Sequence, residues 1–287
     1  MLYLTRFRFL SQDQEADFMM TVKRTCYDTA YPFGTLTRFD ATELEFEPVT
    51  ILYGGNGSGK TTALNVIAQA LKLQRDSRYN QSPFFETYVK LCEYDLRGET
   101  PEHSRVITSD DVFDYMLNVR AINEGVDNRR EELFQEYFDD KYARYQFRSL
   151  EDYEALRKRN LAQSRTQSKY VKARLAHNVR ELSNGESAKF YFTSKIEDNG
   201  LYLLDEPENS LSPTRQQELV QFLEESARFF GCQFIIATHS PFLLGMRGAK
   251  IYDMEADPVI PRRWTELPAV RAYYDFFRNH ADAFRED

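Results

Sequence analysis

Apolar positions along the chain follow two periods, and together they predict an alternating order of strands and helices. Alternating or unbroken apolar runs predict strands at residues 2–10, 43–53, 201–205, 233–237 and 249–254. Apolar residues spaced three and four apart predict helices at residues 61–73, 187–196, 216–230 and 267–280. Such alternation favours an α/β fold with a central, mostly parallel sheet flanked by helices. We expect the last helix to pack on the edge of the core.

The middle of the chain has a different pattern. Residues 76–180 begin with irregular and short β-like pieces and then become helical, rich in Glu, Lys, Arg and Ala, with few Gly or Pro after Pro101. We therefore predict two parts: a core formed by residues 1–75 and 181–287, and a mainly helical insertion lobe formed by residues 76–180.

Composition adds few constraints. The mean hydropathy is −0.60, and no apolar run approaches the roughly 20 residues of a membrane span. The first thirty residues lack the pattern of a secretory signal, so we expect a cytoplasmic protein with no membrane partner. Cys26, Cys92 and Cys232 are far apart, and the four histidines are scattered, which favours neither disulfides nor a Cys/His metal cluster.

One segment matches a phosphate-binding loop. Residues 54–61, GGNGSGKT, fit G-x-x-x-x-G-K-[ST] and lie between a predicted strand and a predicted helix. Glycines let successive backbone N–H groups turn toward a phosphate, and the helix directs its positive end at the same oxygens. The alternative is a glycine-rich turn with no ligand. The residues that we expect to contact ATP are Gly55, Asn56, Gly57, Ser58, Gly59, Lys60, Thr61 and Thr62.

Two adjacent carboxylates, Asp205 and Glu206, end the apolar strand at residues 201–205. Side chains alternate along a strand, so the two acids face different ways. This division suits Asp205, together with the Thr61 hydroxyl, as a partner of Mg²⁺, and Glu206 as a general base for water. The alternative is an ordinary strand end with solvated acids.

The segment LSNGE, residues 182–186, has the pattern of a helix start. Ser183 at the N-cap and Glu186 three residues later form a capping box. Gly185 allows close approach, so the free N–H groups at this helix start are equally suited to receive a phosphate. The residues alone leave both readings open.

The order of four segments resembles an ABC-type ATPase head, more narrowly the structural-maintenance-of-chromosomes and recombination type. GGNGSGKTT resembles the Walker A loop, LSNGE the signature motif, LYLLDEPENSLS the Walker B strand with its D-loop, and ATHSP the switch histidine segment. The resemblance covers the first and last thirds of the chain and leaves residues 76–180 almost unaccounted for.

The resemblance implies a homodimer in which two heads enclose two ATP molecules. Ser183, Gly185 and Glu186 of one subunit would then lie against ATP on the other. His239 would sense the γ-phosphate, and residues 210–212 would lie at the dimer seam. The chain departs from the family in having no clear Q-loop glutamine, with only Gln81 and Gln146 as candidates. The adenine-stacking ring is also unassigned, with candidates Tyr31, Phe33 and Phe39.

DEPEN together with THSP resembles a group of bacterial soluble ATPases linked to defence against phage or plasmids. Some relatives, the overcoming-lysogenization-defect group, carry a Toprim nuclease after the switch histidine. Only 48 residues follow His239, so we expect any nuclease to be a separate polypeptide. The resemblance therefore implies a protein partner that acts as the effector.

Residues 155–180 contain eight basic residues and no acidic one, in a chain whose formal net charge is −8. Arg165, Lys169 and Lys172 share one helical face by spacing, which suits contact with DNA or RNA phosphates or with a nucleotide. The alternative is a solvated helix face, or one that pairs with an acidic partner protein. The basic residues are Arg157, Lys158, Arg159, Arg165, Lys169, Lys172, Arg174 and Arg180.

Three functions remain after this reading. We favour an ATPase that cycles between an ATP-bound dimer and separate subunits and acts with a partner. An ATP-binding switch or scaffold that restrains a separate toxin or nuclease is the alternative. The ATP-binding subunit of a membrane transporter agrees less well with DEPEN, THSP and the missing Q-loop glutamine.

Overall fold

The computed structural model describes residues 1–22, 29–37, 43–142, 166–172, 184–209 and 211–284. Its chain divides into two compact units. The first joins Met1–Phe113 to Asn184–Asp287, and the second is Asp114–Ser183.

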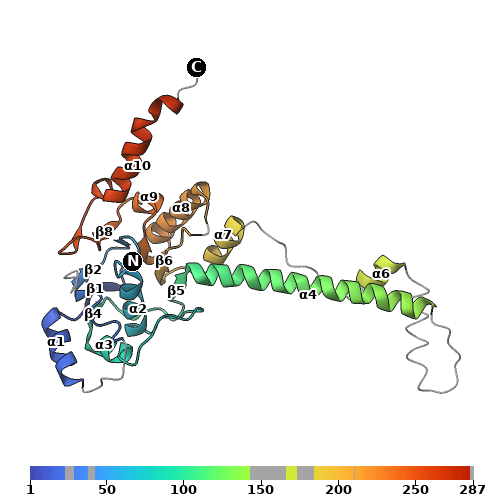
Figure 1. The fold of residues 1–287 in the computed structure, drawn as a ribbon, viewed down its shortest axis with the longest axis horizontal. Coiled ribbons are helices and arrows are strands. Elements are labelled where there is room, and N and C mark those ends of the chain that lie inside the picture. Colours follow the sequence, from blue (N-terminus) through green and yellow to red (C-terminus); the bar gives the residue numbers. More distant parts are fainter. Residues whose placement is uncertain (23–28, 38–42, 143–165, 173–183, 210, 285–287) are drawn as a thin grey trace. The chain divides into compact units, whose positions relative to one another are not determined.

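A six-stranded sheet forms the centre of the first unit (Figure 1). Its strand order is β5-β6-β7-β3-β8-β9, and every pairing is parallel except β8 with β9. This confirms the predicted α/β fold with a mostly parallel sheet. The strands are β3 (Val49–Tyr53), β5 (Arg105–Thr108), β6 (Leu201–Asp205), β7 (Gln233–Thr238), β8 (Lys250–Asp253) and β9 (Ile260–Pro261).

Helices cover both faces of this sheet. Leu52, Leu203 and Ile235 belong to one buried cluster that also contains the apolar residues of α2. Neighbouring positions such as Ile51 and Ile236 are equally buried and, by strand alternation, face the opposite side. There α8 packs against β7 and against α7 and α9. These helices are α2 (Lys60–Ala70), α7 (Asn184–Lys195), α8 (Pro213–Phe229) and α9 (Pro241–Leu244).

A smaller antiparallel sheet, in the order β2-β1-β4, shares the core with α2. Gln233 joins the two sheets. Its buried side chain accepts bonds from the backbone N–H groups of Tyr3 (2.7 Å) and Leu4 (2.9 Å) and donates to the Leu4 carbonyl (2.7 Å). The strands are β1 (Leu4–Arg8), β2 (Glu43–Glu45) and β4 (Glu93–Leu96). Helix α1 (Gln12–Thr21) follows β1 in the chain, and α3 (Phe85–Leu91) precedes β4.

The second unit is helical where the structure describes it. Helix α4 (Ser109–Tyr142) runs into it from the first unit, and α6 (Gln167–Lys172) packs on it through Val171 against Leu133 and Tyr137.

The boundary between the units differs from the prediction. We predicted that the lobe begins at residue 76, but residues 76–113 belong to the first unit. There β4 pairs with β1, and β5 pairs with β6. The sequence indicated short β-like pieces in this stretch, but it did not show that they pair with strands far away in the chain.

The C-terminal helix also differs from its prediction. We expected residues 267–280 to pack on the edge of the core, and the structure forms α10 (Pro268–Asn279) there, preceded by a 3₁₀ turn, Trp264–Glu266. Only Val270 of this helix and the preceding Leu267 are buried. The Ala269 N–H donates to the Tyr53 hydroxyl at 3.3 Å, so the contacts that the described residues show between α10 and the core lie in its first turn.

Candidate functional site

The predicted site residues meet because three strands are parallel and in register. Tyr53 of β3 pairs with Thr238 of β7, and Asp205 of β6 pairs with Ala237 of β7. The segments that follow these strands therefore emerge at the same edge of the sheet, where open parallel sheets bind ligands.

The loop between β3 and α2 has the curled backbone that the motif predicts. Gly57 and Gly59 have φ angles of +83° and +91°, a region that residues with a Cβ rarely adopt. At Gly59 a Cβ would also lie 3.1 Å from the Leu36 side chain. Helix α2 begins at Lys60, so its free N–H groups point toward the loop.

Two buried polar side chains in this loop are suited to phosphate oxygens. The Lys60 Nζ, 4% exposed, donates to the carbonyls of Gly54 (2.6 Å) and Gly55 (2.9 Å). The buried Ser58 hydroxyl has no hydrogen-bond partner among the described residues. An unpaired buried hydroxyl is costly, and an anion bound in the loop would satisfy it.

Glu255 is a contact of the loop that the sequence did not reveal. Its Oε1 accepts a hydrogen bond of 2.6 Å from the Gly55 backbone N–H. The two residues are 200 positions apart, and no motif connects them.

Asp205 and Thr61 lie together, as expected for a shared metal. The Thr61 hydroxyl donates to Asp205 Oδ1 at 3.2 Å. Burial, with a smaller contribution from the neighbouring Glu206, raises the pKa of Asp205 to about 6.

No group of three or more His, Cys, Asp or Glu among the described residues is arranged to hold a metal alone. Mg²⁺ in nucleotide sites takes one or two protein oxygens and completes its shell with phosphates and water. The hard oxygens of Thr61 and Asp205 fit that donor set.

Glu206 occupies a strained position next to Asp205. Its φ is +47°, which costs a residue other than glycine on the order of 1–2 kcal/mol. Its Oε1 lies 3.9 Å from Lys60 Nζ and 4.0 Å from His239 Nδ1. The Asn209 side-chain amide donates to its Oε2 at 2.9 Å. Strained residues of this kind concentrate at functional sites.

His239 is held by Glu208, a second residue that sequence reasoning missed. Glu208 is 5% exposed, and its Oε1 accepts from the Thr238 hydroxyl (2.5 Å) and the His239 backbone N–H (3.1 Å). The same oxygen lies 3.5 Å from His239 Nδ1. The DEPEN segment contains Glu208, but only the pairing of β6 with β7 reveals its contact.

The structure narrows the candidates for the adenine-stacking ring. Phe33 is buried and stacks on Phe18, with centroids 4.7 Å apart, so it is a core residue. The Tyr31 hydroxyl donates to the Thr62 hydroxyl at 3.2 Å, which places this half-buried ring beside the start of α2. Phe39 lies outside the described residues.

Of the two glutamines considered for the Q-loop, the structure describes only Gln81, which does not lie at the end of a strand. Gln81 is in an irregular segment, and Gln146 lies outside the described residues. Thr108 is the residue at the end of β5 that pairs with Asp205. Its N–H donates to the buried Asp111 carboxylate at 2.7 Å.

The predicted signature segment is described only in part. Helix α7 begins at Asn184, directly after the predicted N-cap Ser183, which lies outside the described residues. Gly185 and Glu186 form its first turn. Of the basic stretch 155–180, the structure describes residues 166–172, and Lys169 is exposed there. Residues 211–212 lead into α8, whereas residue 210 is not described.

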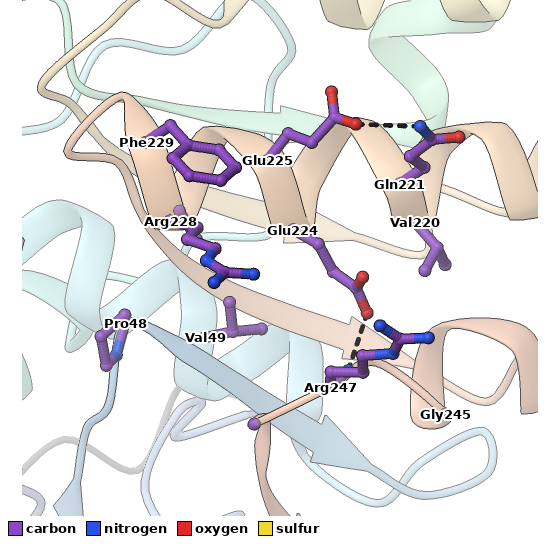
Figure 2. Close-up of a pocket in the computed structure, with 12 residues that line it drawn as sticks. Pro48, Val49, Val220, Gln221, Glu224, Glu225, Arg228, Phe229, Gly245 and Arg247 are labelled. Carbon is purple, nitrogen blue, oxygen red and sulfur yellow. Dashed lines mark hydrogen bonds between the residues drawn. The ribbon is translucent and has the colours of Figure 1, made fainter.

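A separate pocket of about 910 Å³ lies at the opposite ends of the strands (Figure 2). Pro48 and Val49, at the start of β3, line it together with Glu224 and Arg228 of α8. Glu224 accepts a bond of 2.7 Å from the Arg247 N–H across it. The phosphate-binding loop follows the other end of β3, so this pocket is not part of the site.

Comparisons with known proteins identify related domains. A sequence-family profile described as "AAA domain, putative AbiEii toxin, Type IV TA system" matches residues 127–245, less than half of the chain. The matched region includes Asp205, Glu206 and His239 and begins after the phosphate-binding loop. No match was found among curated proteins.

Two solved structures are similar to the chain. One is a dimeric ATP-binding cassette in a post-hydrolysis state, bound to ADP and Pi, with 13% identity, a TM-score of 0.36, and coverage of 79% of this chain and 91% of that one. The other is described as an inward-facing ABC transporter, with 15% identity, a TM-score of 0.36, and coverage of 79% and 78%. No helix in the described ranges has both the length and the apolar character that a bilayer crossing needs.

Proposed function

We propose that this protein binds ATP with Mg²⁺ and hydrolyses it at the edge where β3, β6 and β7 end. The observation that carries the proposal is the convergence of a P-loop with two carboxylates. Lys60 and Thr61 follow β3, while Asp205 and Glu206 end β6, and the four side chains lie within 4 Å of a neighbour in the set.

In this proposal the P-loop holds the phosphates. Amides of Gly55, Asn56, Gly57, Ser58 and Gly59 and the first turn of α2, with Thr62, surround the triphosphate, and Lys60 exchanges its bonds to loop carbonyls for bonds to phosphate oxygens. Thr61 and Asp205 would hold Mg²⁺, which would supply positive charge beside the phosphates.

Glu206 is the general base. It orients a water molecule for in-line attack on the γ-phosphate and accepts its proton. Lys60 Nζ and His239 Nδ1 lie 3.9 Å and 4.0 Å from Glu206 Oε1. They place a positive charge and a hydrogen-bonding group next to the γ-phosphate, where negative charge develops during attack. His239 reports whether the γ-phosphate is present.

ATP binding drives dimerisation. The signature segment of one copy, Ser183, Gly185 and Glu186, completes the nucleotide site of the other, which is the arrangement that the resemblance to ABC-type heads implies. A helix start with free N–H groups is suited to this role.

The cycle acts on a separate protein partner, in a DNA-related or anti-phage process. The profile match to a toxin–antitoxin domain supports this direction. The second candidate is a switch that binds ATP, turns it over slowly and restrains a toxin or nuclease. A comparison of turnover by the isolated protein and by its complex separates the two. Nucleic-acid binding through residues 155–180 is part of the proposal, and salt-dependent retention of labelled DNA or RNA tests it.

The deciding experiment uses two substitutions. Lys60→Ala should abolish Mg²⁺-ATP binding, measured by titration calorimetry. Glu206→Gln should keep binding but slow turnover by about 10² to 10⁴ and accumulate an ATP-bound dimer. Glu225→Gln, an exposed glutamate on α8, is the matched control. If wild type neither binds nor hydrolyses Mg²⁺-ATP, the proposal is wrong.

A further inference from the structure

Helix α10 exposes an unusual amount of aromatic surface. Tyr273, Tyr274, Phe276 and Phe277 are between 50% and 55% exposed, and Phe284 in the following turn is 69% exposed. Single exposed rings are common on protein surfaces, whereas a contiguous group of them marks an interaction surface.

These residues form one continuous stripe. Val270, Tyr273, Tyr274 and Phe277 recur at the spacing of one helical face. Val270 at the base is buried against the first unit, while the rings beyond it are not. The aromatic stripe therefore continues beyond Val270, along a part of α10 whose rings are exposed.

Charged residues follow one flank of the stripe in alternating order. Arg271, Asp275 and Arg278 are spaced four and three apart, so they lie along the same side of α10. Asp282 continues this series of charged residues in the 3₁₀ turn Ala281–Phe284, after the helix ends at Asn279. Their signs are reversed about the point between Phe276 and Phe277. Asp275 and Arg278 are one position away from that pair on either side, and Arg271 and Asp282 are five positions away.

This reversal is what pairing of two identical helices requires. When two copies pack antiparallel about a two-fold axis, residue i meets j and j meets i, and the same flank of each faces the other. With the axis between Phe276 and Phe277, Asp275 of each copy faces Arg278 of the other. Arg271 then lies toward the 3₁₀ turn of the other copy, which carries Asp282. The aromatic stripes then cover one another.

We propose that α10 is a dimerisation helix whose partner is α10 of a second copy. The two helices pair antiparallel, and they pair when the protein has no nucleotide bound. A membrane surface fits less well, because helices that lie on membranes carry a polar face rich in Lys and Arg, and this flank has equal numbers of acids and bases.

The attachment of α10 gives this pairing a role in the proposed ATP cycle. Its first turn bonds to Tyr53, the last residue of β3 before the phosphate-binding loop. A dimer held through α10 keeps a second nucleotide head at high effective concentration after hydrolysis separates the ATP interface. This role rests on the proposed function, whereas the pairing itself does not.

Charge-reversed variants of the full chain test the pairing. Arg278→Asp places acids opposite Asp275, and Asp275→Arg places bases opposite Arg278. Both variants lose the same intrahelical pair, at 3.3 Å in the native helix, and each places two like charges three residues apart. We expect each to self-associate at least about tenfold more weakly than wild type in sedimentation without nucleotide. An equimolar mixture of the two should recover the dimer.

Further measurements separate this proposal from the proposed function. Phe277→Ser, at an exposed position, should weaken the dimer without changing the circular dichroism spectrum. Lys60→Ala should leave it intact. A nucleotide-free wild type that sediments as a monomer at micromolar concentrations overturns the pairing, as does a dimer that the α10 variants leave unchanged. Stable binding of α10 to lipid vesicles in place of self-association overturns it as well. None of these results bears on ATP binding.

Discussion

Glu208 Oε1 lies 3.5 Å from His239 Nδ1 and also accepts the His239 backbone N–H at 3.1 Å. One buried carboxylate therefore accepts the backbone N–H and lies beside the ring of the residue that we propose as the γ-phosphate sensor. The Thr238 hydroxyl bonds to the same oxygen at 2.5 Å. Glu208 acts through His239, as a positioning residue.

Glu208→Gln should lower kcat by about 10- to 100-fold, the usual range for loss of a supporting contact in an active site. The amide keeps the shape of the side chain but removes the charge next to His239. KM for ATP and the melting temperature should change little. A variant that lost activity by unfolding would instead have a lower melting temperature. Equal turnover by Glu208→Gln and the control Glu225→Gln would remove this role.

Asp205→Asn should stabilise the nucleotide-free protein and weaken its binding of Mg²⁺. Burial raises the pKa of Asp205 to about 6, above its ordinary value, so ionisation in the folded state is unfavourable. Stability from this group therefore falls as pH rises toward 6 and stays low above it. At pH 7.5 the neutral amide should raise the melting temperature of the nucleotide-free protein by several degrees.

The same Asp205→Asn variant should lose most of the stabilisation that Mg²⁺-ATP gives to wild type. The amide is a poor ligand for a hard cation. Thermal unfolding with and without Mg²⁺-ATP measures both effects. Asp17→Asn, an exposed acid on α1, is the control and should change neither. An Asp205→Asn protein that is less stable without nucleotide contradicts the unfavourable ionisation of this carboxylate in the folded state.

The sequence predicted the parts of the site that form contiguous motifs. Lys60 and Thr61 could be placed because a strand, a glycine loop and a helix follow one another directly. Glu255 could not, since its contact with Gly55 spans 200 positions and depends on β8 pairing beside β3. Glu208 stood in a quoted motif, but its bond to His239 depends on the register of β6 and β7.

The fold was predictable to a similar degree. Apolar runs such as β3 and β6 were recognisable, whereas β4 and β5 were assigned to the helical lobe because their pairing partners lie far away in the sequence. For α10 the pattern correctly predicted an amphipathic helix. Periodicity shows that a face is apolar, and it does not show what covers that face.

Gln233→Leu should destabilise the first unit by on the order of 3 to 6 kcal/mol, because it leaves three buried backbone groups at Tyr3 and Leu4 without partners. Leucine is similar in size, so loss of packing contributes little. Urea unfolding measures the change. Gln221→Leu, on the exposed side of α8, should be close to neutral. A loss below about 1 kcal/mol would mean that water or a shift of β1 replaces these bonds.

Gly59→Ala and Gly248→Ala form a matched pair that separates backbone strain from the phosphate-binding loop. Both glycines have left-handed φ angles, +91° and +73°, so each alanine should cost about 1–2 kcal/mol of stability. A Cβ added at Gly59 would lie 3.1 Å from the Leu36 side chain, whereas a Cβ added at Gly248 would meet nothing within 4 Å. Gly59→Ala should therefore lose more stability and also ATP affinity, while Gly248→Ala should bind ATP as wild type does. Denaturant unfolding and ATP titration of both variants measure these effects. Undiminished ATP affinity in Gly59→Ala would show that the loop does not need its observed curl to hold the phosphates.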